Sequence, residues 1–510
     1  MGKQFSIQIN RFDGGMMEDK RIGWSSGSGV FFTDKFSLTK HFDAFTLPHS
    51  LIPLYKTKAF EGEDKAKGIV KYIYASRNFP TDTSFKLYGY GIDTGTTKAQ
   101  VFMRDPTETS WSTPTNNKST NTGRDTKIFF YYKGFIYMLR TGGNLMRFDV
   151  TSSAVFEEAY QAIGAYTNSA EPTHHPADDC AYFFLDNKVY RLNNTSWDGL
   201  VLTLPSNMKI VSATPHGNYL AIGCVTLGDL AVKSIVFLWD RDSSLTTLTE
   251  RIDFGDGSIE YLHSVYGNLF SVMSFYPSSA YANKRAMLLV KVAIGNQAKL
   301  VNFLTSDVTS GIVVYQNKVV KNDRLYFPAK VQLNGDTRIG IWSMDSNGEL
   351  SLEIVNPDAT SFQGIYALAN VWLMSHSGDY SDDLLDNEYD TDSTGSRYSL
   401  TSPCVYESLK FDGGDASMKK KLIGVTVMHE PLPTLGQVVL KYRKDEETNW
   451  TTIFTHTTDN SISHDAINIE SSGANFPEFN EIQFRIESTG GAVITGLKAR
   501  GEYIPSNLYD

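Results

Sequence analysis

The residues in this sequence most able to do chemistry include a pair of histidines followed by two aspartates. His174 and His175 precede Asp178 and Asp179, and together these side chains have the types that bind metal ions. Adjacent side chains on an extended segment point to opposite faces, so two neighbouring histidines seldom share one ion. We therefore favour a loop at the edge of a sheet over a metal site.

A second candidate is an acidic run within residues 376–399. The run contains seven carboxylates: Asp379, Asp382, Asp383, Asp386, Glu388, Asp390 and Asp392. Carboxylates can bind Ca²⁺, but the run lacks the glycine and the final glutamate of a calcium-binding loop. Like charges repel one another, and the run can bury little apolar surface. We expect a long, mobile, solvated loop that becomes ordered only in an assembly, with calcium binding as the less favoured alternative.

Motifs of common enzymes do not occur in the sequence. It contains no H-E-x-x-H, P-loop, EF-hand or G-x-S-x-G motif. Ser343–Gly348 comes closest to a sialidase Asp-box, but its glycine is one place late and no tryptophan follows. Carboxylates for sugar hydrolysis need only meet in space, and nothing in the sequence selects such a pair. We predict a protein without a catalytic centre, a metal or a cofactor.

Composition and charge narrow the class of protein. The 510 residues carry a net charge of −10, which disfavours binding to nucleic acid phosphates. Cys180, Cys224 and Cys404 lie far apart, so we expect buried thiols rather than a zinc site. The N-terminal residues lack the apolar stretch of a signal peptide, and no apolar run is long enough to span a membrane. These features predict a soluble protein that folds in a reducing cytoplasm.

An apolar and aromatic segment recurs along the first four-fifths of the chain. Its seven copies start 37 to 55 residues apart, at Ser84, Lys133, Cys180, Gly217, Gly267, Asn322 and Leu368. Most copies are followed by a hairpin whose Asp, Asn and Ser residues favour tight turns. Four antiparallel strands in each period is the size of a propeller blade. The sequence therefore predicts an all-β protein with a β-propeller of about six to seven blades.

The remaining segments predict two further parts. Residues 1–60 are rich in Gly and Ser and show no clear alternation, so we expect an extended N-terminal arm and linker. Residues 61–410 form the propeller, and the alternating segments of residues 411–510 predict a β-sandwich. The arm carries apolar side chains that we expect to anchor it on a neighbouring subunit. These anchors are Phe12, Met16, Met17 and Trp24.

Three segments carry a resemblance to structural proteins of tailed bacteriophages. Ile9–Met16, with the sequence INRFDGGM, resembles the start of many of these proteins. His41–Tyr55 is similar to a segment that follows in them, and Gly436–Phe454 resembles their terminal sandwich domain. The order of arm, propeller and sandwich is similar to the nozzle proteins that close the tails of short-tailed phages.

The resemblance implies a non-catalytic structural subunit of a phage tail, placed in the nozzle, the ring or the tail tip. Its partners would be copies of itself in a ring, as in a hexameric nozzle, and other tail proteins of the virion. DNA would pass through such a ring as cargo without being bound sequence-specifically. One alternative is a carbohydrate-binding or glycosidase-type propeller that serves as a receptor-binding tail protein. Another is an intracellular scaffold that binds peptides.

Overall fold

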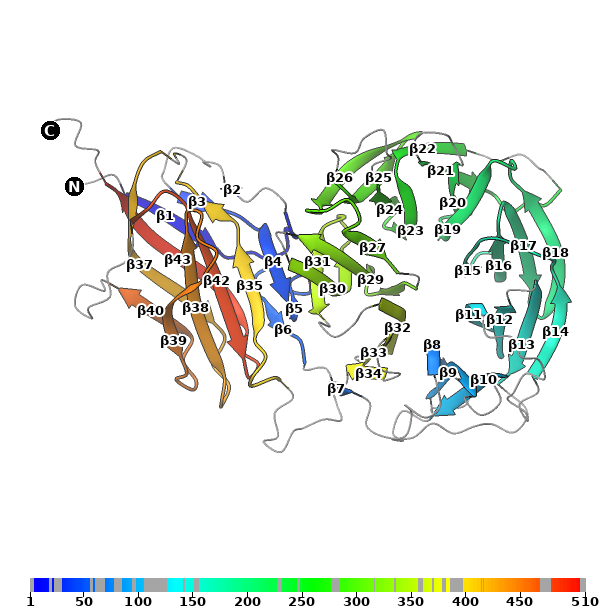
Figure 1. Ribbon diagram of the computed structural model, residues 1–510, viewed down its shortest axis with the longest axis horizontal. Coiled ribbons are helices and arrows are strands. Elements are labelled where there is room, and N and C mark those ends of the chain that lie inside the picture. Colours follow the sequence, from blue (N-terminus) through cyan, green and yellow to red (C-terminus); the bar gives the residue numbers. More distant parts are fainter. Residues whose placement is uncertain are drawn as a thin grey trace. The chain divides into compact units, whose positions relative to one another are not determined.

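Strands make up all the regular structure in the described residues of this computed structural model (Figure 1). The structure describes residues 4–17, 21–22, 30–55, 58–59, 69–77, 85–93, 98–104, 126–140, 143–150, 156–226, 232–244, 248, 250–276, 285–315, 317–333, 336–355, 361–368, 371–377, 382–385, 398–413, 415, 417–467 and 478–504. Within these ranges, no helix has the length and apolar character needed to cross a membrane. The prediction of an all-β protein is confirmed.

The chain divides into two compact units. The first, which we call the sandwich unit, comprises Met1–Lys56, Gly340–Val355 and Asp386–Asp510. The second, the propeller unit, comprises Thr57–Ile339 and Asn356–Leu385. The sandwich unit is therefore built from both ends of the chain and from one internal segment, Gly340–Val355, which also contributes strands to a blade of the propeller.

Seven groups of strands follow one another as blades along the described part of the chain. Blade 1 contains β8 (Ile69–Arg77), β9 (Phe85–Asp93) and β10 (Lys98–Arg104). Blade 2 contains β11 (Thr126–Tyr132), β12 (Phe135–Arg140), β13 (Asn144–Asp149) and β14 (Phe156–Ala162). Blade 3 contains β15 (Ser169–His175), β16 (Cys180–Leu185), β17 (Lys188–Asn193) and β18 (Ser196–Thr203). Blade 4 contains β19 (Met208–His216), β20 (Tyr219–Thr226), β21 (Lys233–Trp239) and β22 (Glu250–Asp256).

The last three blades continue this pattern with small variations. Blade 5 contains β23 (Ser258–Val265), β24 (Asn268–Phe275), β25 (Met287–Ile294) and β26 (Gln297–Thr305). Blade 6 contains β27 (Ile312–Val314), β28 (Val319–Lys321), β29 (Arg324–Leu333), β30 (Asp336–Met344) and β31 (Leu350–Val355). Blade 7 contains β32 (Ser361–Leu368), β33 (Val371–Ser377), β34 (Asp382–Leu385) and β7 (Lys58–Ala59). The predicted propeller is thus confirmed, and the described strands form seven blades.

The blades close into a ring whose first strands lie innermost (Figure 1). Strand β11 contacts β15, β15 contacts β19, and β19 contacts β23. Strand β24 contacts β27, β29 contacts β32, β32 contacts β8, and β8 contacts β11, which completes the circle. The closing blade takes its outermost strand from the start of the propeller, because β7 pairs with β34. Early and late parts of the propeller sequence are therefore held together by strand pairing.

The acidic run contributes to this closing blade. Asp382 and Asp383 lie in strand β34, where Asp383 is opposite Ala59 of β7 and Asp382 is opposite Ser375 of β33. A loop was expected at these two positions, and the strand forms because pairing on both sides satisfies its backbone groups. The other carboxylates of the run, Asp379, Asp386, Glu388, Asp390 and Asp392, lie outside the described residues.

Apolar clusters join blade 1 to blade 2, blade 2 to blade 3, blade 3 to blade 4 and blade 4 to blade 5. One cluster combines Tyr88 of blade 1 with Phe148 of blade 2, and the next combines Tyr137 of blade 2 with Phe183 of blade 3. Blades 3 and 4 meet where Tyr182 packs edge-on against Trp239, with 5.9 Å between ring centroids. Ring closure removes the free faces that an open array would expose, so each sheet buries apolar side chains on its neighbour. Cys180, Cys224 and Cys404 are buried and not disulfide-bonded, as expected.

The described strands of the sandwich unit include two large sheets and one short two-stranded sheet. The first has the order β3 (Val30–Phe32), β1 (Gln4–Ile9), β43 (Ile494–Tyr503), β37 (Lys420–His429) and β40 (Ser463–Ile467), with β41 (Glu478–Phe479) paired to β37. The second has the order β2 (Arg21–Ile22), β36 (Lys410–Phe411), β42 (Ile482–Thr489), β35 (Cys404–Ser408) and β4 (Phe36–Lys40). Strand β38 (Gln437–Lys444) pairs with β42 and with β39 (Thr451–His456), and β5 (Phe42–Asp43) pairs with β6 (Ile52–Pro53). The N-terminal strand β1 pairs along its whole length with the C-terminal strand β43.

The expectation that the arm packs on a neighbouring subunit needs correction. Phe12 is 0% exposed and packs edge-on against Tyr406 of its own chain, while Met16 is 1% exposed. Met17 is 38% exposed, and Trp24 lies outside the residues whose side chains are described. A segment that is already tethered loses less entropy on docking to its own chain than to a separate subunit. Phe12 and Met16 are therefore core residues of the sandwich and not free anchors.

Tyr55 and Tyr398, which flank the propeller sequence, lie side by side in the sandwich unit. Tyr55 precedes the inserted sequence and Tyr398 follows it, and their rings stack with centroids 4.8 Å apart and planes 19° apart. Stacked aromatic pairs contribute beyond the apolar area that they bury. The stack therefore holds Tyr55 and Tyr398 together within the sandwich unit.

Candidate functional site

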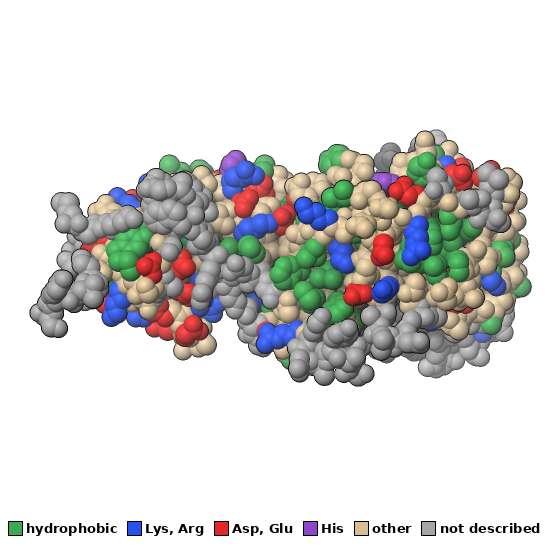
Figure 2. Space-filling view, turned by 90° about the horizontal axis from the view of Figure 1, so that it is seen from above, with side chains coloured by type: hydrophobic (Ala, Val, Ile, Leu, Met, Phe, Trp, Pro, Cys, Tyr) green, Lys and Arg blue, Asp and Glu red, His purple; other side chains and the backbone are tan. Residues whose placement is uncertain are grey.

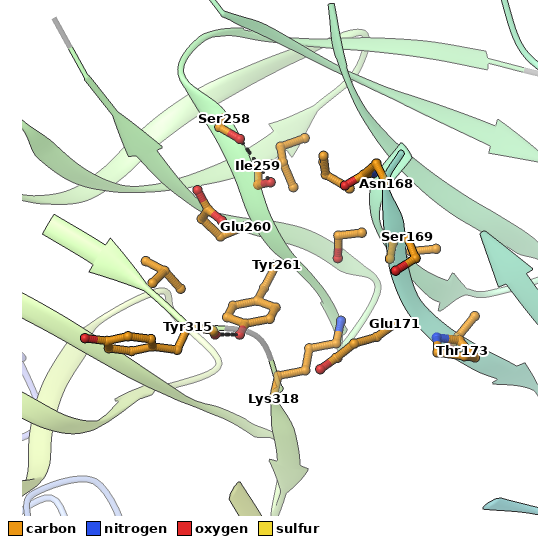
Figure 3. Close-up of a pocket in the computed structure, with 16 residues that line it drawn as sticks. Asn168, Ser169, Glu171, Thr173, Ser258, Ile259, Glu260, Tyr261, Tyr315 and Lys318 are labelled. Atoms are coloured by element: carbon orange, nitrogen blue, oxygen red, sulfur yellow. Dashed lines mark hydrogen bonds between the residues drawn. The ribbon is translucent and has the colours of Figure 1, made fainter. Parts of the chain in front are cut away.

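A cavity of about 180 Å³ lies among the innermost strands of four blades (Figure 3). Its walls come from β15, β19 and β23 and from the segment that joins β27 to β28. Innermost strands face the axis of a propeller, and their side chains alternate between that axis and the blade interior. Residues from distant repeats therefore meet at the axis.

One wall of the cavity brings together groups of opposite charge from blades 3 and 6. Glu171 on β15 lies beside Lys318, and the backbone N–H groups of Asn317 and Lys318 also donate to its carboxylate. Burial raises the pKa of Glu171 to about 6, although Lys318 and these donors oppose the rise. Burial lowers the pKa of Lys318 to about 8, against the opposing charge of Glu171. Lys318 also donates to the carbonyl of Leu262 over 2.7 Å, which fixes the ammonium group.

A second carboxylate, Glu260 on β23, lies on the other side of Tyr261 in Figure 3. Its partner is Ser274, whose hydroxyl donates to Oε1 of Glu260. Burial raises the pKa of Glu260, and the bond from Ser274 opposes the rise. Within the described part of the chain, Ser274 is the only group that favours the charged form of this carboxylate. Glu260 therefore has less compensation for its charge than Glu171.

Two tyrosines shape the cavity between these carboxylates. The Tyr261 hydroxyl donates to the carbonyls of Tyr315 and Asn317, so blade 5 holds the segment between β27 and β28 in place. The ammonium of Lys318 lies 5.8 Å from the centre of the Tyr261 ring. The cavity thus combines two carboxylates, one amine and aromatic walls. Such a lining suits a small polar ligand, and its groups can also exchange protons near neutral pH.

Sequence patterns did not identify these residues, because they lie in three different repeats. Their position within the repeats is the sequence feature that could have identified them. Glu171 and Glu260 both lie on the first strand of a repeat. Lys318 immediately precedes the short strand β28. An aligned set of repeats would have shown charged residues on strands that face the axis.

The histidine and aspartate segment forms contacts between blades at the end of β15. His174 and Lys133 of blade 2 both contact the Asp179 carboxylate, with His174 at 2.8 Å. His175 is 0% exposed and donates to the Tyr219 carbonyl of blade 4 over 3.0 Å. In the described ranges, no group of three or more His, Cys, Asp or Glu side chains is arranged to hold a metal ion. The segment therefore tethers three adjacent blades.

Arg241 of blade 4 completes this tether, and its removal is expected to destabilise the propeller unit. Its guanidinium donates to Nδ1 of His175 over 2.6 Å and pairs with Asp178 at 3.3 Å. Asparagine suits the local φ of 70° but cannot reach these partners. Arg241→Asn should therefore cost about 1–3 kcal/mol in chemical denaturation. Arg251→Asn on the exposed face of β22 is the control, and equal effects of the two changes would contradict a tether.

Comparisons with known proteins found similarity of fold to solved structures. No family model matches the chain, and no curated protein matches it. The β-propeller domain of Cps50 (Swd1) from Myceliophteria thermophila aligns with 64% of this chain and 99% of its own length, at 10% identity and a TM-score of 0.43. Catalytically inactive virginiamycin B lyase from Staphylococcus aureus aligns with 65% of this chain and 99% of its own, at 10% identity and a TM-score of 0.38. The computationally designed protein Ika8 aligns with 74% of this chain and 99% of its own, at 10% identity and a TM-score of 0.35.

Proposed function

We propose that this protein is a non-catalytic structural subunit of a bacteriophage tail, in the nozzle, the ring or the tail tip. Copies of the subunit form a ring-shaped homo-oligomer around the passage for DNA, in contact with other tail proteins of the virion. The resemblance of Ile9–Met16, His41–Tyr55 and Gly436–Phe454 to tailed-phage structural proteins supports this role. A closed propeller and a sandwich built from both chain ends also suit a rigid building block.

The observation that carries the proposal is an apolar surface on the outermost strand of blade 5. Leu300 and Phe303 of β26 are 44% and 38% exposed, and Ile294, the last residue of β25, is 60% exposed. Figure 2 shows hydrophobic side chains gathered in patches over the propeller unit. Exposed apolar patches often mark protein contacts, because their burial on a partner is favourable.

The strand register places two of these side chains on one face. Leu300 is opposite Lys291 and Phe303 is opposite Leu289, two residues that lie two positions apart on β25. On a regular strand, side chains two positions apart share a face. The register of β26 shifts near Leu300, so Leu300 and Phe303 share a face although they lie three positions apart. Leu300 and Phe303 therefore form one continuous surface that suits a neighbouring subunit.

Leu300→Asp is expected to prevent assembly while leaving the fold of the subunit intact. A carboxylate at this surface must be desolvated when the interface forms, which costs several kcal/mol without a partner charge. Light scattering after size-exclusion chromatography should show rings for the wild-type chain and monomers for the variant. Leu200→Asp on the outermost strand β18 of blade 3, where Leu200 is 51% exposed, is the matched control. A wild-type chain that stays monomeric even with its tail partners would refute the proposed function.

A further inference from the structure

The two carboxylates of the cavity at the propeller axis differ in the groups that stabilise their negative charge. Glu171 has Lys318 and two backbone donors, whereas the compensation described for Glu260 is the Ser274 hydroxyl. With Glu171 and Lys318 offsetting each other, an ionised Glu260 gives the cavity a net charge of −1. A buried charge is stable only with a partner, so the cavity favours a ligand that brings one positive charge.

The groups around Glu260 suit a ligand with an alkyl chain. Ile259, Val314 and the side chains of Tyr261 and Tyr315 also line the cavity. Aromatic faces attract cations, and apolar walls favour the methylene groups next to an ammonium. The Tyr276 hydroxyl, which donates to the carbonyl of Ile312, lies near Glu260, and the charge of Glu260 contributes to raising the pKa of Tyr276. Ser274 and Tyr276 thus both lie near Glu260.

Several other polar groups of the cavity already have protein partners. The Ser212 hydroxyl accepts the N–H of Leu262, and the side-chain amide of Asn168 donates to the carbonyl of Ile210 over 2.7 Å. The Tyr261 hydroxyl donates to the segment between β27 and β28. A sugar needs several available hydrogen-bonding groups around its ring, whereas a primary ammonium needs chiefly one carboxylate. The lining therefore favours an amine over a carbohydrate.

We propose that this cavity binds a primary alkylammonium group, with Glu260 as the carboxylate that receives it and Tyr261 and Tyr315 beside its alkyl chain. The group can belong to a small free amine or to a lysine side chain of another protein. The site lies at the axis and is independent of the assembly surface on β26. Binding and assembly can therefore fail separately.

Calorimetric titration of the full chain with butane-1,4-diamine and with Nα-acetyl-lysine amide tests the proposal. Both probes carry a primary ammonium, and the tighter of the two identifies the source of the natural ligand. Glu260→Gln keeps the shape of the side chain and the Ser274 contact but removes the charge, so binding should weaken about 10- to 100-fold. Glu250→Gln, at an exposed position on the outermost strand of blade 4, should bind as the wild-type chain does.

The pH dependence of binding by the wild-type chain gives a second measurement, which remains valid if the Glu260 variant folds poorly. The carboxylate must be ionised while the amine stays protonated, so affinity should rise as the pH increases through the raised pKa of Glu260 and fall once the amine loses its proton. Absence of binding by both amines, equal binding by Glu260→Gln, or affinity that does not vary with pH would overturn the proposal. Binding of methyl glucoside in place of the amines would overturn it in favour of the carbohydrate alternative.

Discussion

Replacing Phe12 by alanine should destabilise the sandwich unit by about 3–5 kcal/mol, the usual cost of truncating a fully buried phenylalanine. The ring is 0% exposed and meets Tyr406 edge-on, with 5.2 Å between centroids and 86° between planes. Truncation would remove this contact and leave a cavity in the core. Because a whole domain is stable by only about 5–15 kcal/mol, the loss should be visible directly in unfolding experiments.

Hydrogen exchange is the appropriate measurement, because two units need not unfold together. In Phe12→Ala, amides of β1 and β43 should exchange faster, while those of blades 3 and 4 should keep their protection. Met17→Ala is the matched control, since Met17 is 38% exposed and its loss should cost no more than about 0.5 kcal/mol. If Phe12 were instead an anchor on a neighbouring subunit, Phe12→Ala would weaken assembly and leave the isolated chain as stable as before.

Acidification should destabilise the sandwich unit through His41, which lies between β4 and β5. Burial, with a further contribution from Lys40, lowers the pKa of His41 from 6.5 to about 4. The unfolded chain then binds more protons than the folded chain between about pH 6.5 and pH 4. The stabilisation is therefore present above pH 6.5 and lost as the pH falls to about 4, by up to about 3 kcal/mol.

His41→Asn should remove this part of the pH dependence. Asparagine does not titrate, and it tolerates the φ of 58° that the backbone adopts at this position. The backbone bonds from His41 N–H to Glu353 and from Leu54 N–H to His41 would remain. Denaturant midpoints of the two chains should converge as the pH falls from about 6.5 to about 4. His49→Asn, at an exposed position, is the control for the change of residue type, and an unaltered slope in His41→Asn would contradict the assignment.

Local patterns in the sequence were sufficient to predict the propeller. Gly and Asn turns such as those before Tyr219 and Asn268, together with alternating aromatic residues, specify hairpins from neighbouring residues. The spacing of the copies then predicts the number of blades, because each period supplies one sheet. The sandwich was predicted for the same reason from residues 411–510, although its N-terminal strands were not.

Those strands depend on pairings between opposite ends of the chain. Phe5, Ile7 and Ile9 alternate with polar residues, which is a strand pattern, but their partner β43 lies at the other end of the chain, and β7 is likewise distant from β34. A local alternation predicts a strand but does not reveal a partner so far away in the sequence. For this reason an arm was expected where the structure has part of a sandwich.

The sequence by itself determined that the chain forms strands, that the strands repeat as blades and that a different β domain follows. Turn chemistry and side-chain alternation act between near neighbours, so the sequence carries this information directly. Only the tertiary structure decided that Phe12 is a core residue and that Glu171, Glu260 and Lys318 line one cavity. Contacts of this kind depend on ring closure and on the joining of the chain ends, which bring together residues that share no local pattern.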